Sequence, residues 1–359
     1  MLFRSFSGAG LKTLQETTQA FVYSFHAIGG NPERKALLKN IVGMIPGTNP
    51  AFESQSIVIG AHYDHLGLGW TLGKQGQGGQ IHNGADDNAS GVAILLELAR
   101  VLSASYKPQR TIIFAAFSGE EVGRKGSIEY VKSQAVFPAS KIIGMINLDT
   151  VGRLGQNKLT VLGSQSATEW PHIFRGVSYV TGIPTAMAKE NLDASDHVSF
   201  HEVGVPAVQF FSGPNLDYHR PSDTFEKIDG EGLVKIAAVL KETVEYLANR
   251  REPMTVTLPG LDPQVSKLSR SRRKVSLGTI PDFTYQGAGY RLDGTVDNSP
   301  AHRAGLRKGD IIMKIEDQDI SGLKDLSEVL KTFQPGQRIS ITYVRSSELL
   351  NSDLILEAN

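Results

Sequence analysis

The sequence predicts an α/β protein with a mixed, mostly parallel sheet that carries helices on both faces, followed by a small β-rich domain. Short apolar runs that suit buried strands alternate with segments of helical periodicity. Histidine and carboxylate residues follow several of these strand-like runs. A proline-containing basic stretch then precedes a C-terminal segment of short strand-like runs and Gly/Pro turns.

The individual elements follow from the apolar pattern along the chain. Residues 1–38 have weak patterning, whereas from Asn40 the runs are clear. In the first helical segment Val92, Leu95 and Ala99 recur at helical spacing. The predicted elements are strands at 40–47 and 56–65, a helix at 89–104, strands at 110–119, 141–152, 158–163 and 206–211, and a helix at 230–250.

Composition limits the classes of function. The chain has 359 residues, enough for about two domains. Lys plus Arg and Asp plus Glu each total 37, so the zero net charge gives no support for a nucleic-acid or anionic-membrane partner. The absence of cysteine excludes a disulfide scaffold and a thiolate metal site. We find no apolar run of transmembrane length and expect no membrane span.

The chain divides into four predicted segments. Three prolines and the run "SRSRR" mark an exposed linker near residue 260. The segments are an N-terminal segment at 1–38, the main domain at 39–250, the linker at 251–273 and the small domain at 274–359.

Five short pieces of the main domain carry chemistry-bearing residues. They are "AHYDH", "NGADDNASG", "SGEE", "NLD" and "DYHRPSD". Each ends a predicted strand or opens a loop, and α/β folds bind their ligands at the carboxyl ends of strands. Histidines and carboxylates without cysteine suit zinc. The adjacent acids of "SGEE" could also lie in a solvated loop. Because the other four pieces accompany them, we predict that the two acids have different roles in one site.

In this order the pieces resemble the co-catalytic zinc exopeptidases of metallopeptidase family 28, of the bacterial zinc aminopeptidase type, over residues 38–250. The resemblance implies the zinc-exopeptidase fold and two Zn²⁺ ions. It implies Asp87 as the bridging ligand, Glu121 and His219 on one ion, and His62 and Asp149 on the other.

The resemblance also implies roles around the ions. Glu120 is expected as the general base and Tyr218 as a donor to the carbonyl oxygen as it becomes an oxyanion. Asp64 is expected to fix the tautomer of His62. The peptide bond between Asp87 and Asn88 is expected to be cis.

The other histidines and the neighbouring acids receive structural interpretations. His65, His197 and His201 match no ligand position and are expected to be pocket wall or structural residues. Those expected at the surface are His26, His82, His172 and His302. Those expected to organise loops or to be hydrogen-bonded neighbours are Asp86, Asp196 and Asp223.

The small domain resembles a PDZ domain of the strand order found in bacterial periplasmic proteases, through "SLGT", "SPAHRAGLRKGD" and "PGQRISITYVR". In such domains a hydrophobe–Gly–hydrophobe loop binds a C-terminal carboxylate. Leu277 and Gly278 match this loop, but Thr279 replaces the second hydrophobe.

The expected function is removal of N-terminal residues from peptide substrates, with a C-terminal peptide as the ligand of the PDZ domain. A carboxypeptidase, a glutaminyl cyclase and a non-catalytic scaffold acting through the PDZ domain remain open as rival functions. The piece "AGLKTLQE" resembles the tail of a protease-associated domain, so the 1–38 segment is expected to be a remnant of one. A periplasmic or secreted bacterial location, with the leader missing, is expected.

Overall fold

The computed structural model describes residues 2–14, 21–29, 34–70, 77–133, 136–188, 195–258 and 273–358. The chain divides into two compact units with separate hydrophobic cores, the first drawn mainly from residues up to 259 and the second mainly from later residues. Within the described ranges, no helix has the length and apolar character that a membrane crossing needs.

The N-terminal unit is built on one eight-stranded sheet of order β1-β2-β4-β3-β5-β8-β6-β7. Pairs β3–β4, β3–β5, β5–β8 and β6–β7 are parallel, and β1–β2, β2–β4 and β6–β8 are antiparallel. The strands are β1 (Val22–Gly29), β2 (Arg34–Ile45), β3 (Ser56–His62), β4 (Thr111–Phe117), β5 (Ile142–Leu148), β6 (Leu159–Leu162), β7 (Thr185–Met187) and β8 (Ala207–Phe211). The predicted mixed, mostly parallel sheet is therefore confirmed.

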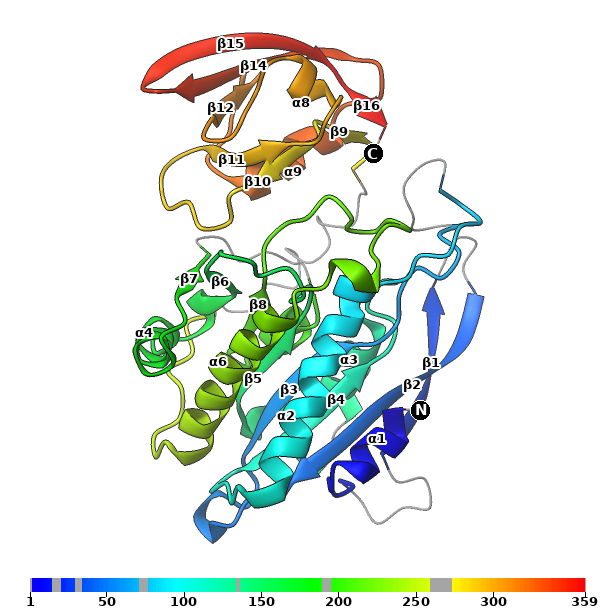
Figure 1. The fold of residues 1–359 in the computed structure, drawn as a ribbon, viewed down its shortest axis with the longest axis vertical. Coiled ribbons are helices and arrows are strands. Elements are labelled where there is room, and N and C mark those ends of the chain that lie inside the picture. Colours follow the sequence, from blue (N-terminus) through cyan, green and yellow to red (C-terminus); the bar gives the residue numbers. More distant parts are fainter. Residues whose placement is uncertain are drawn as a thin grey trace. The chain divides into compact units, whose positions relative to one another are not determined.

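Helices cover both faces of this sheet because its central strands are apolar on both sides. Ile57 and Ile59 of β3 pack into one core cluster, whereas Val58 between them packs into another. The helices of the first face are α1 (Leu2–Gly8), α2 (Gly91–Ser105), α4 (Trp170–Thr181) and α6 (Gly230–Asn249). Those of the second face are α3 (Lys125–Ser133) and α5 (His197–His201). Figure 1 shows α2 and α6 side by side across the strands.

The sheet starts earlier in the chain than predicted. The predicted strand at 40–47 begins at Arg34 and pairs along its length with β1, a strand that the apolar pattern does not predict. The boundary predicted at residue 39 thus falls inside β2. β1 is an edge strand whose Ser24 and His26 are exposed, so its apolar pattern is weak. The likeness to a protease-associated domain stays a prediction.

The first unit also extends past residue 250. Met254 is buried in its main core cluster. Thr255 donates its backbone N–H to Glu169 at 3.0 Å, and Val256 forms a β-bridge with Ala167. Residues 251–258 of the predicted linker therefore lie against the first unit, and 259–272 are outside the described residues.

The C-terminal unit is β-rich, as predicted. Its main sheet has the order β10-β11-β12-β14-β15 with β13 paired to β12, and β9 pairs with β16. Leu326 and Leu330 of its longer helix are buried in its core. The strands are β9 (Val275–Ser276), β10 (Thr279–Pro281), β11 (Tyr290–Thr295), β12 (Ile311–Ile315), β13 (Gln318–Asp319), β14 (Arg338–Arg345), β15 (Glu348–Ile355) and β16 (Glu357–Ala358), and the helices are α8 (Pro300–Arg303) and α9 (Leu323–Lys331).

Candidate functional site

Three parallel neighbouring strands deliver the first site residues to one edge of the sheet. His62 is the last residue of β3 and stands in register with Phe117, the last residue of β4. Glu120 and Glu121 follow β4 three and four residues later, and Asp149 directly follows β5. Because parallel strands end at the same edge, residues far apart in the chain meet there.

Two loops bring the remaining candidate ligands to the same place. Asp87 lies in the turn Ala85–Ser90 that precedes α2, and its side chain is buried. His219 lies in the loop after β8, with a left-handed backbone φ of 57°. The five predicted ligands thus converge from five separate segments.

The carboxylate of Asp87 faces two different sets of donor atoms. Its Oδ1 lies 3.2 Å from His62 Nε2, which lies 3.4 Å from Asp149 Oδ1. Its Oδ2 lies 3.2 Å from His219 Nε2, which lies 3.1 Å from Glu121 Oε2. We call these three-atom groups the first donor set and the second donor set; they share only Asp87.

These separations fit the demands of a metal ion. Ligand atoms about 2.0–2.1 Å from a tetrahedral zinc ion lie about 3.3 Å from one another. The four distances in the two donor sets run from 3.1 to 3.4 Å. Nitrogen and carboxylate oxygen donors are also those that zinc accepts. The nitrogen and oxygen atoms of the two donor sets therefore have separations and chemistry that suit zinc ligands.

The electrostatics of the cluster favour bound positive charge. Burial opposes protonation of His219, but Asp87 and Glu121 outweigh it and raise its pKa to about 9. The pKa of His62 also lies well above its usual value, because Asp149 and Asp87 outweigh burial. Burial would raise the pKa of Asp87, but the two histidines hold it below its usual range. A divalent cation can replace the protons that such a cluster attracts.

Glu120 is in the same neighbourhood but outside both donor sets. Burial raises the pKa of its carboxyl well above the usual value, against the attraction of His62. In the described ranges, two His/carboxylate groups are compact enough to hold a metal ion: His62, Asp87 and Asp149 form the first donor set, and His65, Asp87 and Glu121 form the other group. Neither group includes Glu120. Of these two adjacent residues, Glu121 thus lies among the donor atoms and Glu120 lies beside them.

Asp64 positions this pair of acids. Its carboxylate accepts the backbone N–H of Glu120 at 3.1 Å and that of Glu121 at 3.4 Å. The predicted contact with His62 exists, but His62 Nδ1 lies 3.1 Å from the main-chain carbonyl of Asp64 and 3.9 Å from its carboxylate. The carbonyl is therefore the group that fixes the tautomer of His62.

Asn88 ties the strand ends to the start of α2. Its side chain donates to the carbonyls of Leu148 at 2.8 Å and His62 at 3.3 Å, and accepts from Gly91 N–H at 3.1 Å. The peptide bond between Asp87 and Asn88 is cis, as predicted.

Buried acids hold the turn that carries Asp87. The carboxylate of Asp223 accepts the backbone N–H of Asp86 at 2.9 Å and of Asp87 at 3.1 Å. Asp86 in turn accepts the N–H of Gly152 at 2.6 Å. Asp196 accepts a hydrogen bond from Ser127. None of these three acids belongs to a donor set, in line with the structural interpretation.

The prediction for His82 was wrong. Its side chain is buried, with Nδ1 3.0 Å from the carbonyl of Gln80. The loop after β3 folds back here, since the N–H of His82 donates to Gly67 at 2.8 Å. The sequence of this loop is polar, so its pattern does not show that His82 is buried.

The other histidines lie as expected. His201 is structural, with Nε2 2.8 Å from the carbonyl oxygen of Ala207. The histidines expected at the surface that are exposed are His26, His172 and His302.

His65 lies in the wall of the site, one of the two placements expected for it, but its contact with Glu121 was not predicted. Its Nδ1 lies 2.8 Å from Glu121 Oε1 and 3.9 Å from Asp87 Oδ2. It forms, with Asp87 and Glu121, one of the two compact groups that could hold a metal ion. The feature of the sequence that could have indicated this contact is the position of His65 in "HYDH", three residues after the predicted ligand His62.

Tyr218 stacks on a candidate ligand. Its ring centroid lies 4.0 Å from that of His219, with an angle of 18° between the ring planes. The residue is 45% exposed. The tyrosine is therefore accessible beside the second donor set, and its role as an oxyanion donor stays a prediction.

The predicted peptide loop of the C-terminal domain is held by its neighbours. The Leu277 side chain is buried in the domain core, and its carbonyl accepts the N–H of Ala301 at 2.9 Å. Gly278 has φ +71°, and a Cβ there would lie 2.1 Å from Ser299 Cβ, so only glycine fits. The hydroxyl of Thr279 lies 3.0 Å from that of Tyr290.

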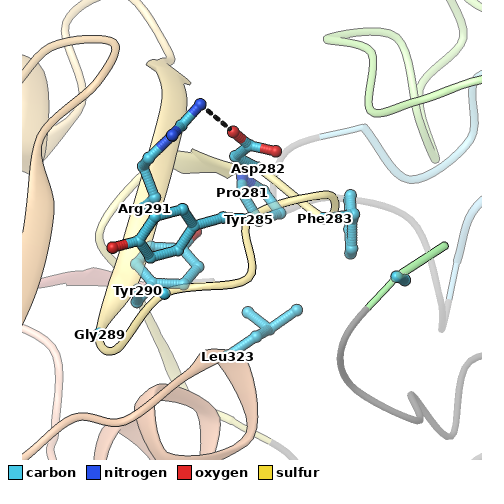
Figure 2. Close-up of a pocket in the computed structure, with 10 residues that line it drawn as sticks. Pro281, Asp282, Phe283, Tyr285, Gly289, Tyr290, Arg291 and Leu323 are labelled. Atoms are coloured by element: carbon cyan, nitrogen blue, oxygen red, sulfur yellow. Dashed lines mark ion pairs between the residues drawn. The ribbon is translucent and has the colours of Figure 1, made fainter. Parts of the chain in front are cut away.

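A pocket opens next to this loop, between the end of β10 and the start of α9. Figure 2 shows aromatic rings around it and the ion pair at its edge, where Arg291 and Asp282 are 2.8 Å apart. Its labelled lining residues are Pro281, Asp282, Phe283, Tyr285, Gly289, Tyr290, Arg291 and Leu323.

Comparison with known families gives two matches. The family described as Peptidase family M28 matches residues 40–244. The family described as PDZ domain matches residues 289–356. The first match covers more than half of the chain and contains all five candidate ligands and Glu120.

Individual relatives agree with the first match. Aminopeptidase YwaD of Bacillus subtilis (strain 168) is 29% identical over 229 residues, covering 61% of this chain and 47% of the relative. The chain thus spans about half the length of this curated relative. The solved aminopeptidase from Aneurinibacillus sp. strain AM-1 is 29% identical with a TM-score of 0.51, over 64% of this chain and 52% of that one.

A further solved structure has the same fold at low identity. The glutaminyl cyclase of Porphyromonas gingivalis is 18% identical with a TM-score of 0.55, over 68% of this chain and 88% of that chain. At this identity the likeness shows the fold alone.

Proposed function

This chain belongs to peptidase family M28, and from that premise we propose that it is a zinc-dependent aminopeptidase that removes N-terminal residues from peptides. The observation that carries the proposal is the placement of Asp87 between two donor sets, with Glu120 outside both. Relatives whose names include aminopeptidase and zinc metalloprotease support the reaction class and the metal.

The chemistry divides between the ions and the chain. When bound, zinc would supply Lewis acidity that polarises the scissile carbonyl and lowers the pKa of the attacking water. The first donor set would hold one ion and the second donor set the other. Glu120 accepts the proton of the attacking water and delivers it to the leaving amine. Its place beside both donor sets but outside them leaves its carboxylate available for both transfers.

A carboxypeptidase would need a cation near the motifs to bind the substrate carboxylate, and two of the arginines near them, Arg153 and Arg124, already have protein partners. Arg153 Nη2 lies 3.2 Å from Asp223 and 3.4 Å from Asp217. Arg124 lies 3.1 Å from Glu202 and also donates to Ser199. These contacts disfavour the use of either side chain on a substrate carboxylate.

A glutaminyl cyclase and a non-catalytic scaffold fit the donor atoms less well. A glutaminyl cyclase needs one zinc ion, whereas two donor sets favour two. A non-catalytic scaffold would need no Glu120 beside the donor atoms.

Metal content, combined with activity on a panel of free and N-blocked aminoacyl substrates, tests the proposed aminopeptidase function directly. Fewer than two ions per chain, or no hydrolysis of free aminoacyl amides by the loaded protein, would contradict it.

N-acetylation of a peptide substrate is expected to lower kcat/KM by at least about 30-fold. An aminopeptidase binds a free α-amine beside its carboxylates and ions, and loss of one buried charged partner costs roughly 2 kcal/mol or more. The measurement compares one peptide with free and acetylated N-termini on the same zinc-loaded sample. Similar turnover of both would point to another class of exopeptidase.

We also propose that the C-terminal domain binds a C-terminal peptide. β10 is at the edge of its sheet, so an extended peptide can pair with it. The pocket beside Pro281 and Leu323 would receive a side chain of that peptide (Figure 2). The aromatic lining favours an apolar or aromatic residue at that position.

A chain ending at residue 258 is expected to hydrolyse small aminoacyl amides at a near-normal rate. The two units have separate cores, and the five ligands and Glu120 belong to the first. Ending at residue 250 instead would remove Met254 from the core. The measurement compares the full and shortened chains on one chromogenic amide and one long peptide. Loss of small-amide turnover by a folded, zinc-loaded shortened chain would show that the PDZ domain completes the active site.

A further inference from the structure

The His65 ring is enclosed beside the second donor set although it is not one of the predicted ligands. Its side chain is 10% exposed. The His219 ring lies edge-on to it, with centroids 5.9 Å apart and planes at 73°. On another side Gly84 approaches so closely that a Cβ there would lie 2.7 Å from the imidazole. Gly84 also has φ +65°, so a residue with a side chain is doubly disfavoured there.

The distances from His65 separate a hydrogen-bond partner from a metal ligand. Its Nδ1 lies 2.8 Å from Glu121 Oε1, within the range of a hydrogen bond. It lies 3.9 Å from Asp87 Oδ2, longer than the separation of about 3.3 Å between two ligands of one tetrahedral ion. His219 Nε2, at 3.2 and 3.1 Å from Asp87 and Glu121, meets that separation.

The two oxygens of Glu121 therefore have different partners. Oε1 faces His65 Nδ1, and Oε2 faces His219 Nε2 at 3.1 Å. A hydrogen bond to one oxygen leaves the other as the ligand and fixes the rotation of the carboxylate. Without it, the Glu121 carboxylate could turn and offer either oxygen.

We propose that His65 is a positioning residue that holds Glu121 as a single-oxygen ligand for the ion of the second donor set. The proposal rests on the two-metal function proposed above. His65 Nδ1–H donates to Glu121 Oε1, and the ring is kept in place by Gly84 and His219. The first donor set contains neither His65 nor Glu121 and shares only Asp87 with the second donor set. The metal affinity of the first donor set should therefore not depend on His65.

Three variants test the proposal through metal affinity rather than activity. His65→Leu removes the donor. His65→Asn keeps an N–H near the position of Nδ1. His82→Asn is the matched control, since it removes another buried histidine from the same loop whose Nδ1 bonds only the Gln80 carbonyl among the described residues. Each metal-free protein is titrated with Zn²⁺ against a competing chelator, and folding is checked by circular dichroism.

His65→Leu is expected to bind one ion with wild-type affinity and the other about 10–100-fold more weakly, the usual effect of losing an outer partner of a ligand. His65→Asn should restore most of that loss, and His82→Asn should bind two ions normally. Unchanged affinity of both sites in His65→Leu, or equal weakening of both, would overturn the proposal. Complete loss of one ion in both His65 variants would make His65 a ligand and also overturn it. A wild-type protein that binds fewer than two ions would instead contradict the proposed function itself.

Discussion

Replacing Glu120 with glutamine is expected to abolish nearly all hydrolysis while leaving two zinc ions bound. Glutamine has the shape of glutamate but cannot accept a proton from water at neutral pH. Positioned proton transfer contributes about 10²–10⁴-fold to a rate, so kcat should fall by that amount. The backbone N–H of residue 120 still donates to Asp64, so the strand end should keep its geometry. The measurement pairs kcat with metal content on one sample.

The same substitution at the next residue is the matched control. Glu121→Gln removes a donor whose Oε2 lies 3.1 Å from His219 Nε2. It is therefore expected to lower zinc content, most of all at the second donor set. The contrast between the two variants is the critical result. Equal metal loss in both would show that Glu120 is a ligand as well, and the assignment of the base would be wrong.

The sequence was sufficient to predict the central sheet and the residues at its edge. β3, β4 and β5 are buried along their whole length, so each reads as a continuous apolar run. The cluster of polar residues at one edge of the sheet also follows, because the loops that leave parallel strands at one edge bring their polar residues together. The convergence of His62, Asp87 and His219 could be expected from short motifs because each motif sits at a strand end or loop.

The sequence was insufficient where burial depends on distant packing. β1 alternates exposed and half-buried residues as an edge strand, so its pattern resembled that of a loop. His82 is enclosed by the return of its own loop, and His65 by Gly84 and a segment more than a hundred residues later. Polar residues that are buried for such reasons leave no periodic signal.

Asp87→Asn is expected to weaken zinc binding at both donor sets and to remove activity with it. Asp87 is the only residue common to the two sets, with Oδ1 3.2 Å from His62 and Oδ2 3.2 Å from His219. An amide offers one oxygen and no charge, so it cannot serve two dications. Loss of an outer partner already costs about 10–100-fold in affinity, and loss of a shared ligand should exceed that at each site.

Asp86→Asn controls for the loss of a neighbouring buried carboxyl group. Asp86 is the adjacent buried carboxylate, but it bonds the Gly152 N–H and the Asn215 amide rather than a donor atom of either set. Its variant should be less stable, because an amide cannot accept both bonds equally well, yet it should still bind two ions. Zinc titration of the two metal-free variants makes the comparison. If Asp86→Asn loses zinc as Asp87→Asn does, the folding of this turn governs the affinity rather than ligation by Asp87. If Asp87→Asn loses only one ion, the two donor sets do not share a bridging ligand, because a shared carboxylate must affect both.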